Sequence, residues 1–335
     1  MKKKLKRWLL SLLVIFIAIV TIGGLMTVFT PLPASLLIRK IFDGGMAIAP
    51  ENYVEIAARV KVVENINYES KYKSGTLDFF SPENNTKPLP TILWVHGGAF
   101  VGGDKDDVDE YATQIADKGY NVISMNYALS PETTYPTQVK QIGEVYQFLQ
   151  KRAAEYNLDM NQVFLAGDSA GAHMLAQFAM IQTNPEYAKS MKIEAVMDPK
   201  TISGTLLLCG PYDLMKFTDI ADGSKVLDFF IGRIAWAYLG EKDWISNPEF
   251  ANLSIVEYVN KDFPTSFIMD GTVNTFTDHG KLLATKLSSL GVDVSTVFYD
   301  EEGLELKHEY QFEMNNEYSV NTFNKLVEFL ETHSN

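Results

Sequence analysis

Residues 167–171 read G-D-S-A-G and centre on Ser169. They follow an apolar run at 163–166 and precede a helix-like stretch at 172–181. Glycine two positions before and two after the serine lets the backbone close into a sharp strand-to-helix turn that exposes the hydroxyl. The first amides of the helix favour a developing negative charge. The pattern predicts a nucleophilic serine for acyl transfer, with the amide of Ala170 as one oxyanion donor.

A second motif, H-G-G at residues 96–98, ends the apolar run at 91–95. Glycines at the end of a buried strand let backbone N–H groups come close to a substrate oxygen. The amides of Gly98 and Ala99 are therefore the other predicted donors of an oxyanion hole. His96 is expected to hold this loop by hydrogen bonding.

With these motifs, the segment N-Y-A-L-S-P-E at 126–132 and H-E-Y-Q-F at 308–312 resemble an esterase family. The chain is similar, over residues 60–335, to α/β-hydrolases of the hormone-sensitive-lipase-like (HGG/GDSAG) group, although Ala128 stands where the family usually has arginine. The resemblance implies an α/β-hydrolase fold with a mostly parallel central sheet flanked by helices. It also implies a serine esterase whose triad follows the chain order serine, acid, histidine.

The histidine of such a triad can be reached by elimination, because the chain contains only five. His96 belongs to the oxyanion loop, His173 lies one turn beyond Ser169, His279 opens a helix, and His333 lies in a polar tail. His308 follows the last predicted strand, at 295–299, and is therefore expected to be the general base.

The acid is less determined, because Asn274 stands where the family normally has aspartate. An asparagine can orient the histidine ring, but it carries no charge and its amide can favour the wrong tautomer. Asp278 and Asp270, in the same loop, are the favoured substitutes, and Asp278 completes the predicted triad. Asp213, after another strand, is a weaker candidate. A weak or inactive enzyme is the remaining hypothesis.

Apolar runs near 91–96, 120–127, 161–167, 204–209, 265–270 and 295–299 alternate with helix-like stretches, a pattern typical of a parallel sheet. Segments near 59–68 and 72–81 are expected to form its antiparallel start. We assign residues 59–335 to one hydrolase domain and residues 31–58 to a linker with short helices that complete the cap or lie along a membrane. A helical insertion at about 215–262 is predicted to cap the site, which favours a small hydrophobic ester.

The N-terminus begins with five basic residues before an uncharged apolar run at 8–29. As a helix these 22 residues span about 33 Å, enough for a bilayer core. We interpret residues 1–30 as a cytoplasmic leader and an uncleaved transmembrane signal anchor, with cleavage as the alternative. Basic residues stay inside, so the domain would face the extracytoplasmic side of the cell membrane.

The formal net charge is −13, and without the five basic leader residues it is −18. Such a domain should be repelled by nucleic acid and should prefer neutral substrates. The single cysteine excludes an internal disulfide and favours a bacterial surface. The sequence has no zinc-ligand spacing, phosphate loop or dinucleotide fingerprint, so no cofactor or metal is expected.

The sequence therefore predicts a membrane-anchored serine carboxylesterase acting through an acyl-enzyme on Ser169. Two alternatives are an amide, formamide or acetyl-glycan hydrolase with the same machinery, and a catalytically weak surface-binding domain. The natural ester, the acyl-chain preference and the oligomeric state are not encoded in these patterns.

Overall fold

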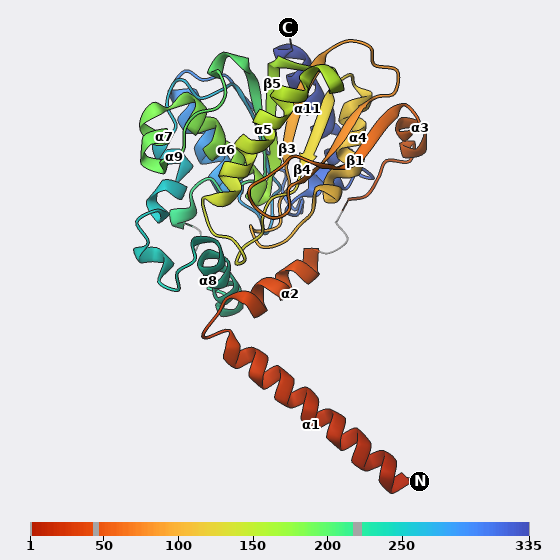
Figure 1. The fold of residues 1–335 in the computed structure, drawn as a ribbon, viewed down its shortest axis with the longest axis vertical. Coiled ribbons are helices and arrows are strands. Elements are labelled where there is room, and N and C mark those ends of the chain that lie inside the picture. The colour runs from red at the N-terminus through yellow and green to blue at the C-terminus, as the bar shows by residue number, and fades with distance from the viewer. Residues whose placement is uncertain (1, 43–46, 217–222, 335) are drawn as a thin grey trace.

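The computed structural model describes residues 2–42, 47–216 and 223–334 (Figure 1). Within them eight strands form one sheet in the order β1-β2-β4-β3-β5-β6-β7-β8. The strands are β1 (Val60–Asn67), β2 (Thr76–Pro82), β3 (Leu89–Val95), β4 (Asn121–Met125), β5 (Leu158–Asp168), β6 (Ile202–Leu208), β7 (Ser266–Met269) and β8 (Val294–Val297). Strands β3 to β8 pair in parallel, whereas β2 pairs antiparallel with both β1 and β4. The predicted mostly parallel sheet with an antiparallel start is confirmed.

The helices follow the strands along most of the chain, as expected for parallel crossovers. They are α1 (Lys2–Met26), α2 (Leu32–Phe42), α3 (Tyr53–Ala57), α4 (Asp109–Asp117), α5 (Thr137–Tyr156), α6 (Ser169–Thr183), α7 (Pro185–Met191), α8 (Lys225–Leu239), α9 (Ile255–Tyr258), α10 (Thr277–Ser289) and α11 (Glu317–His333).

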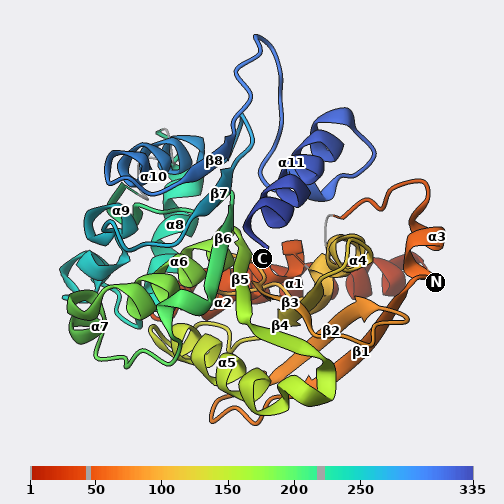
Figure 2. The ribbon, with the colours of Figure 1, turned by 90° about the horizontal axis from the view of Figure 1, so that it is seen from above.

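Both faces of the sheet are covered, and the central strands show how the sequence achieves this. In β5, Leu165 packs in one core layer and Phe164 in the other, and in β3 Leu93 and Trp94 divide in the same way. Successive side chains of a strand point to opposite faces, so a continuous apolar run fills both layers. Helices α5, α6 and α10 cover one face, and α4 and α11 cover the other (Figure 2).

A smaller apolar cluster joins helices α2 and α8 over the loop that follows β3. Ile38 of α2, Ala237 of α8 and Val101 of the loop are buried together. Arg39 adds polar contacts, because its guanidinium donates to the carbonyl of Val101 and forms a bidentate pair with Glu132. Helix α2, from the predicted linker, thus lies against the oxyanion loop. Residues 217–222 of the predicted cap insertion lie outside the described residues.

Helix α8 has a partly covered apolar face. Ile231 and Tyr238 are buried, whereas Val226, in the first turn, is 69% exposed and Leu227 is also exposed. Phe229 is half-exposed and lies against Arg233, whose guanidinium carbon is 4.7 Å from the ring centroid. The apolar face of α8 therefore packs on the domain only from its second turn onwards.

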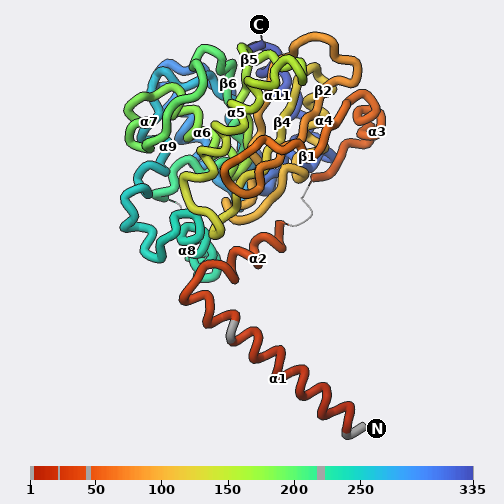
Figure 3. Tube along the Cα trace, viewed as in Figure 1, coloured from red at the N-terminus to blue at the C-terminus, as the bar shows by residue number. Residues whose placement is uncertain are grey.

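Helix α1 projects away from the body of the domain (Figures 1 and 3). Its segment Lys4–Met26 is long and apolar enough to cross a membrane, and none of its most apolar stretch is buried against the rest of the protein. By length and composition alone, a signal sequence near an N-terminus would meet the same criterion.

Candidate active site

The nucleophile elbow forms where β5 ends at Asp168 and α6 begins at Ser169. Ser169 has φ +51°, a left-handed conformation that costs a non-glycine residue about 1 to 3 kcal/mol. A Cβ on Gly171 would collide with the carbonyl oxygens of Val95 and His96, and one on Gly167 would come within 2.8 Å of the Gly171 carbonyl carbon. Both glycines are therefore required for the close approach of α6 to β3 that holds the strained serine.

Ser169 and His308, the predicted nucleophile and base, lie together at the carboxyl end of the sheet. The distance from His308 Nε2 to Ser169 Oγ is 2.8 Å. Burial lowers the pKa of His308 to about 4, so its imidazole is neutral at neutral pH and able to accept a proton. The ring also packs edge-on against Phe276, with centroids 5.3 Å apart. A neutral histidine within hydrogen-bond distance of a serine is the arrangement that general-base catalysis needs.

On the acid side, the partner of His308 Nδ1 is the hydroxyl of Thr275, at 2.8 Å. Thr275 in turn hydrogen-bonds Asp270 Oδ1. Asp270 follows β7, is 1% exposed, and has its pKa raised to about 7 by burial. The structure therefore connects Asp270 to His308 through one intervening hydroxyl.

The other acid candidates are Asn274, Asp278 and Asp213. Asn274 and Asp278 are both exposed, and neither hydrogen-bonds His308 within the described part of the chain. Asp213 instead accepts a hydrogen bond from the Ser254 hydroxyl at 2.6 Å. Among the described residues, Asp278, the acid of the predicted triad, makes no hydrogen bond to the base. Its role remains a prediction without structural support.

The predicted oxyanion loop turns back on itself after β3. Gly98, Ala99 and Phe100 have φ values of +102°, +53° and +63°, and the Gly98 carbonyl accepts from Val101 N at 3.1 Å and Gly102 N at 2.9 Å. Because a trans peptide unit is planar, this carbonyl direction points the amide of Ala99 the opposite way. Among the described residues no acceptor is bound to the Gly98 or Ala99 amide, so both are free to bind a substrate oxygen.

Two aromatic rings hold the start of this loop. His96 Nδ1 donates to the Gly97 carbonyl at 2.8 Å, and its ring stacks on Tyr127 with centroids 4.3 Å apart. The Tyr127 hydroxyl donates to the carbonyls of His96 at 3.1 Å and Gly97 at 2.9 Å. The expected role of His96 therefore agrees with its contacts. Sequence reasoning noted Tyr127 only as part of the 126–132 motif and missed this contact.

A buried carboxylate joins the elbow to the oxyanion loop. Asp168 accepts from Trp94 Nε1 at 2.8 Å and from the Gly97 amide at 2.7 Å. Burial raises its pKa to about 7. Burial, together with Asp168, also raises the pKa of Glu309. A Cβ on Gly97 would lie 2.5 Å from Asp168 and 2.8 Å from Glu309, so both carboxyls lie against this glycine. In the sequence, the one feature that could have indicated these contacts is the aspartate of the G-D-S-A-G motif.

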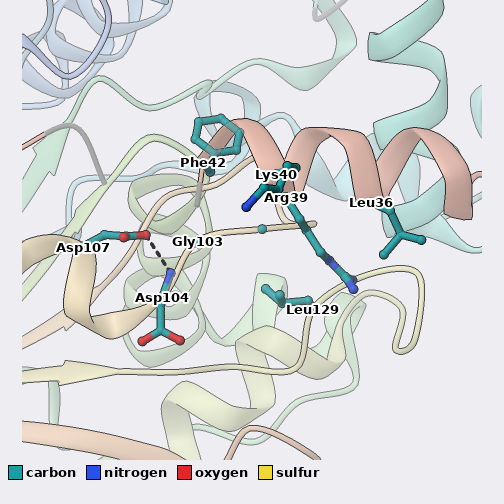
Figure 4. Close-up of a pocket in the computed structure, with 9 residues that line it drawn as sticks. Leu36, Arg39, Lys40, Phe42, Gly103, Asp104, Asp107 and Leu129 are labelled. Carbon is teal, nitrogen blue, oxygen red and sulfur yellow. Dashed lines mark hydrogen bonds between the residues drawn. The ribbon is translucent and has the colours of Figure 1, made fainter. Parts of the chain in front are cut away.

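Two pockets of more than 300 Å³ border these residues, and neither includes Ser169. One of about 310 Å³ lies between α2 and the oxyanion loop and is lined by Leu36, Arg39, Lys40, Phe42, Gly102, Gly103, Asp104, Asp107 and Leu129 (Figure 4). The other, about 430 Å³, lies outside the acid loop and includes Asn274, Thr275 and Asp278. In the predicted cap insertion, Trp244 is buried and packs against Phe250 with ring centroids 5.0 Å apart.

Two side-chain clusters among the described residues have metal-ligand spacing. Cys209, His308 and Glu309 form one, but its histidine is already bonded to Ser169 and Thr275. Asp78, Asp106 and Asp109 form the other, and Lys105 Nζ lies 2.9 Å from Asp78 and also pairs with Asp106. The ammonium group already supplies the cation there, so the donor set does not call for a metal ion.

Comparison with known proteins identifies the family and the fold of the chain. The BD-FAE family model matches residues 77–287. An esterase from Gibberella moniliformis is 29% identical over 269 residues, covering 76% of this chain and 80% of its own. An acetyl esterase from Salmonella typhi is 30% identical over 225 residues, covering 65% of each chain. The crystal structure of an inhibited esterase B from Lactobacillus rhamnosis superposes with a TM-score of 0.71 at 21% identity, covering 86% of this chain and 89% of that one.

The structural likeness, at this identity, establishes the fold, and the family match covers both the oxyanion loop and the elbow. The resemblance predicted from the H-G-G and G-D-S-A-G motifs is confirmed. The chain belongs to the BD-FAE family and is an α/β-hydrolase of the esterase type.

Proposed function

We propose that the protein is a serine carboxylesterase that cleaves small neutral or hydrophobic esters through an acyl-enzyme on Ser169. The observation that carries the proposal is the 2.8 Å contact between Ser169 Oγ and the neutral imidazole of His308. The names of the curated relatives, an esterase and an acetyl esterase, support ester substrates with short acyl groups. The acidic surface, with net charge −13 for the whole chain, disfavours anionic substrates.

In this mechanism Ser169 Oγ attacks the ester carbonyl while its proton passes to His308 Nε2. The negative charge that forms on the carbonyl oxygen is bound by the amides of Gly98, Ala99 and Ala170. His308 then gives the proton to the departing alkoxide, which leaves as an alcohol. A water molecule, deprotonated by His308, attacks the acyl-enzyme, and the same proton returns to Ser169 as the acid product departs.

The test is hydrolysis of p-nitrophenyl acetate and butyrate by the full chain in detergent micelles. We expect Ser169→Ala to lose turnover, down to the residual rate from oxyanion binding alone. Ser190→Ala, which removes an exposed serine on α7, is the matched control and should keep full activity. Turnover close to the unmodified rate in Ser169→Ala would contradict the proposal. Cleavage of p-nitroacetanilide at a comparable rate would favour the amide-hydrolase alternative.

Membrane anchoring through α1 is the second part of the proposal. The apolar segment Lys4–Met26 supports it, and so do exposed apolar side chains where α1 leaves the domain. Leu37 and Ile41 of α2 are 52% and 69% exposed, and Val226 of α8 is also exposed. Helices α2 and α8 lie at the end of the domain from which α1 projects (Figures 1 and 3). Contact with lipid would cover these side chains.

Cysteine labelling tests this topology, because the natural Cys209 is buried. We expect Lys325→Cys, exposed on α11, to react with a membrane-impermeant maleimide on intact bacterial cells. Lys4→Cys should react only after permeabilisation. The reverse pattern would contradict the proposed orientation, and a mature chain that lacks residues 1–30 would establish cleavage instead of anchoring.

A further inference from the structure

The loop between β7 and α10 gives His308 an unusual partner. In a Ser-His-Asp triad a carboxylate accepts the Nδ1 proton of the histidine directly. Here the Thr275 hydroxyl occupies that place, 2.8 Å from His308 Nδ1, and Asp270 lies behind it. Asn274, at the family's usual acid position, has φ +53° and is exposed.

The direction of each hydrogen bond in this chain follows from the acceptor at its end. Above pH 7, where Asp270 is ionised, its carboxylate can only accept, so Thr275 must donate its single proton to Asp270. The threonine oxygen is then left with lone pairs and can only accept from His308, which requires the proton to be on Nδ1. Nε2 is thereby unprotonated and faces Ser169 Oγ as a base.

The surroundings hold the buried carboxylate in place. Asp270 Oδ1 accepts the Gly271 amide at 2.7 Å as well as the Thr275 hydroxyl. The loop that carries Thr275 is held by Thr277, whose hydroxyl donates to the Gly271 carbonyl at 2.7 Å. Within the described residues, Oδ2 of Asp270 is buried without a hydrogen-bond partner. The bonds of this carboxylate are thus concentrated on the oxygen that faces Thr275.

We propose that Thr275 is a positioning residue that transmits the orientation and charge of Asp270 to His308, in place of direct contact between an acid and the histidine. This inference rests on the proposed serine esterase function and adds to it the identity of the acid arm. Asp270 acts on His308 through the Thr275 hydroxyl, and Asn274 and Asp278 play no part in orienting the base.

The test compares Thr275→Val, which keeps the shape and removes the hydroxyl, with Thr275→Ser, which restores it. Thr285→Val, an exposed threonine on α10, is the matched control. With p-nitrophenyl acetate and the full chain we expect Thr275→Val to lower kcat by about 10²- to 10³-fold, below the roughly 10⁴-fold effect of a wrong tautomer. KM should change less than about threefold, since the hydroxyl does not bind substrate. Thr275→Ser and Thr285→Val should stay near the unmodified rate.

Full kcat in a folded Thr275→Val would overturn the relay while leaving the serine mechanism intact, because that mechanism stands or falls with Ser169→Ala. A second measurement does not depend on the valine variant folding. In the ¹⁵N-histidine NMR spectrum of the unmodified chain at pH 8, the His308 signals, assigned by their loss in His308→Ala, should show the proton on Nδ1. A proton on Nε2 would overturn the proposal.

Discussion

The two halves of the site are built by different means. On the nucleophile side, backbone amides, glycines and a strained turn place Ser169 and the oxyanion loop, with φ +51° at the serine and +102° at Gly98. On the acid side, a chain of side-chain hydrogen bonds runs from His308 through Thr275 to Asp270. Such backbone geometry can be recognised in a sequence, because only glycine fits where a Cβ would collide. A chain of side-chain hydrogen bonds cannot be recognised in this way, since Thr, Asp and Asn are ordinary loop residues.

Loss of the distant carboxylate should have the largest effect. In Asp270→Asn the amide can donate to Thr275, which turns the threonine hydroxyl towards His308 and fixes the tautomer that cannot act as base. We expect kcat on p-nitrophenyl acetate to fall by about 10³- to 10⁴-fold. Asp278→Asn, in the same loop, is the control and should remain near the unmodified rate. If Asp278→Asn were the damaging change, the acid side would be misassigned.

The oxyanion loop should be the next most sensitive region. A Cβ on Gly98 would collide with the Gly102 carbonyl oxygen, so Gly98→Ala must displace the loop and its donors. Loss of one oxyanion donor costs about 10²- to 10³-fold in kcat. Gly119→Ala is a matched control because Gly119 has φ +98° with open space around its Cβ position, so it tests backbone strain alone. Equal losses in the two variants would remove the loop from the mechanism.

A smaller effect is expected on the pH dependence of stability, and it comes from the buried carboxyls of Asp168 and Glu309. Burial raises the pKa of Asp168 to about 7 and that of Glu309 above its usual range, with Asp107 and Asp270 adding repulsion at Glu309. A carboxyl whose pKa is raised on folding stabilises the fold below its unfolded pKa near 4, and this stabilisation is lost as pH rises through the folded pKa. For one such group the free energy of unfolding falls by up to about 1.4 kcal/mol per pH unit over that range.

The change in Tm between pH 4 and pH 8 therefore distinguishes the loss of a buried carboxyl from the loss of an exposed one. Glu309→Gln should make Tm less dependent on pH, because one of the groups that loses its proton is removed. Glu328→Gln, exposed on α11, should leave the pH dependence unchanged. An identical pH slope in the unmodified chain and Glu309→Gln would show that this carboxyl pair does not titrate as its burial implies.

The smallest change is expected where the family resemblance points most strongly. Asn274 is exposed and His308 Nδ1 is already occupied by Thr275. We therefore expect Asn274→Asp to alter kcat by less than about threefold. A rise of tenfold or more would mean that the usual acid position still reaches the base, and that the route through Thr275 is secondary.

The sheet and the elbow were predictable because they depend on local and repetitive features. Apolar runs such as residues 163–166 identified the buried strands, and the G-x-S-x-G spacing identified the turn between β5 and α6. His308 could be found by elimination among five histidines. The strands and the turn could be predicted because the residues that form them are close together in the chain. The histidine could be predicted because the chain has few candidates.

The acid relay and the packing of α2 were not predictable in the same way. Thr275 and His308 are 33 positions apart, and the short loop offers several hydroxyl and carboxyl groups that sequence alone cannot rank. Arg39 pairs with Glu132, 93 positions further along the chain, so the sequence of α2 alone does not indicate that this helix packs against the oxyanion loop. The family pattern directs attention to position 274, whereas the hydroxyl that lies beside His308 Nδ1 belongs to the neighbouring Thr275.

The activation of Ser169 by His308 is tested most directly by a fluorophosphonate, which modifies an activated serine. The measurement is the site and the rate of its reaction with the full chain. Peptide mass spectrometry should locate a single adduct on Ser169, and His308→Ala should slow its formation by several orders of magnitude. An adduct on another residue, or an unchanged rate in His308→Ala, would contradict the mechanism.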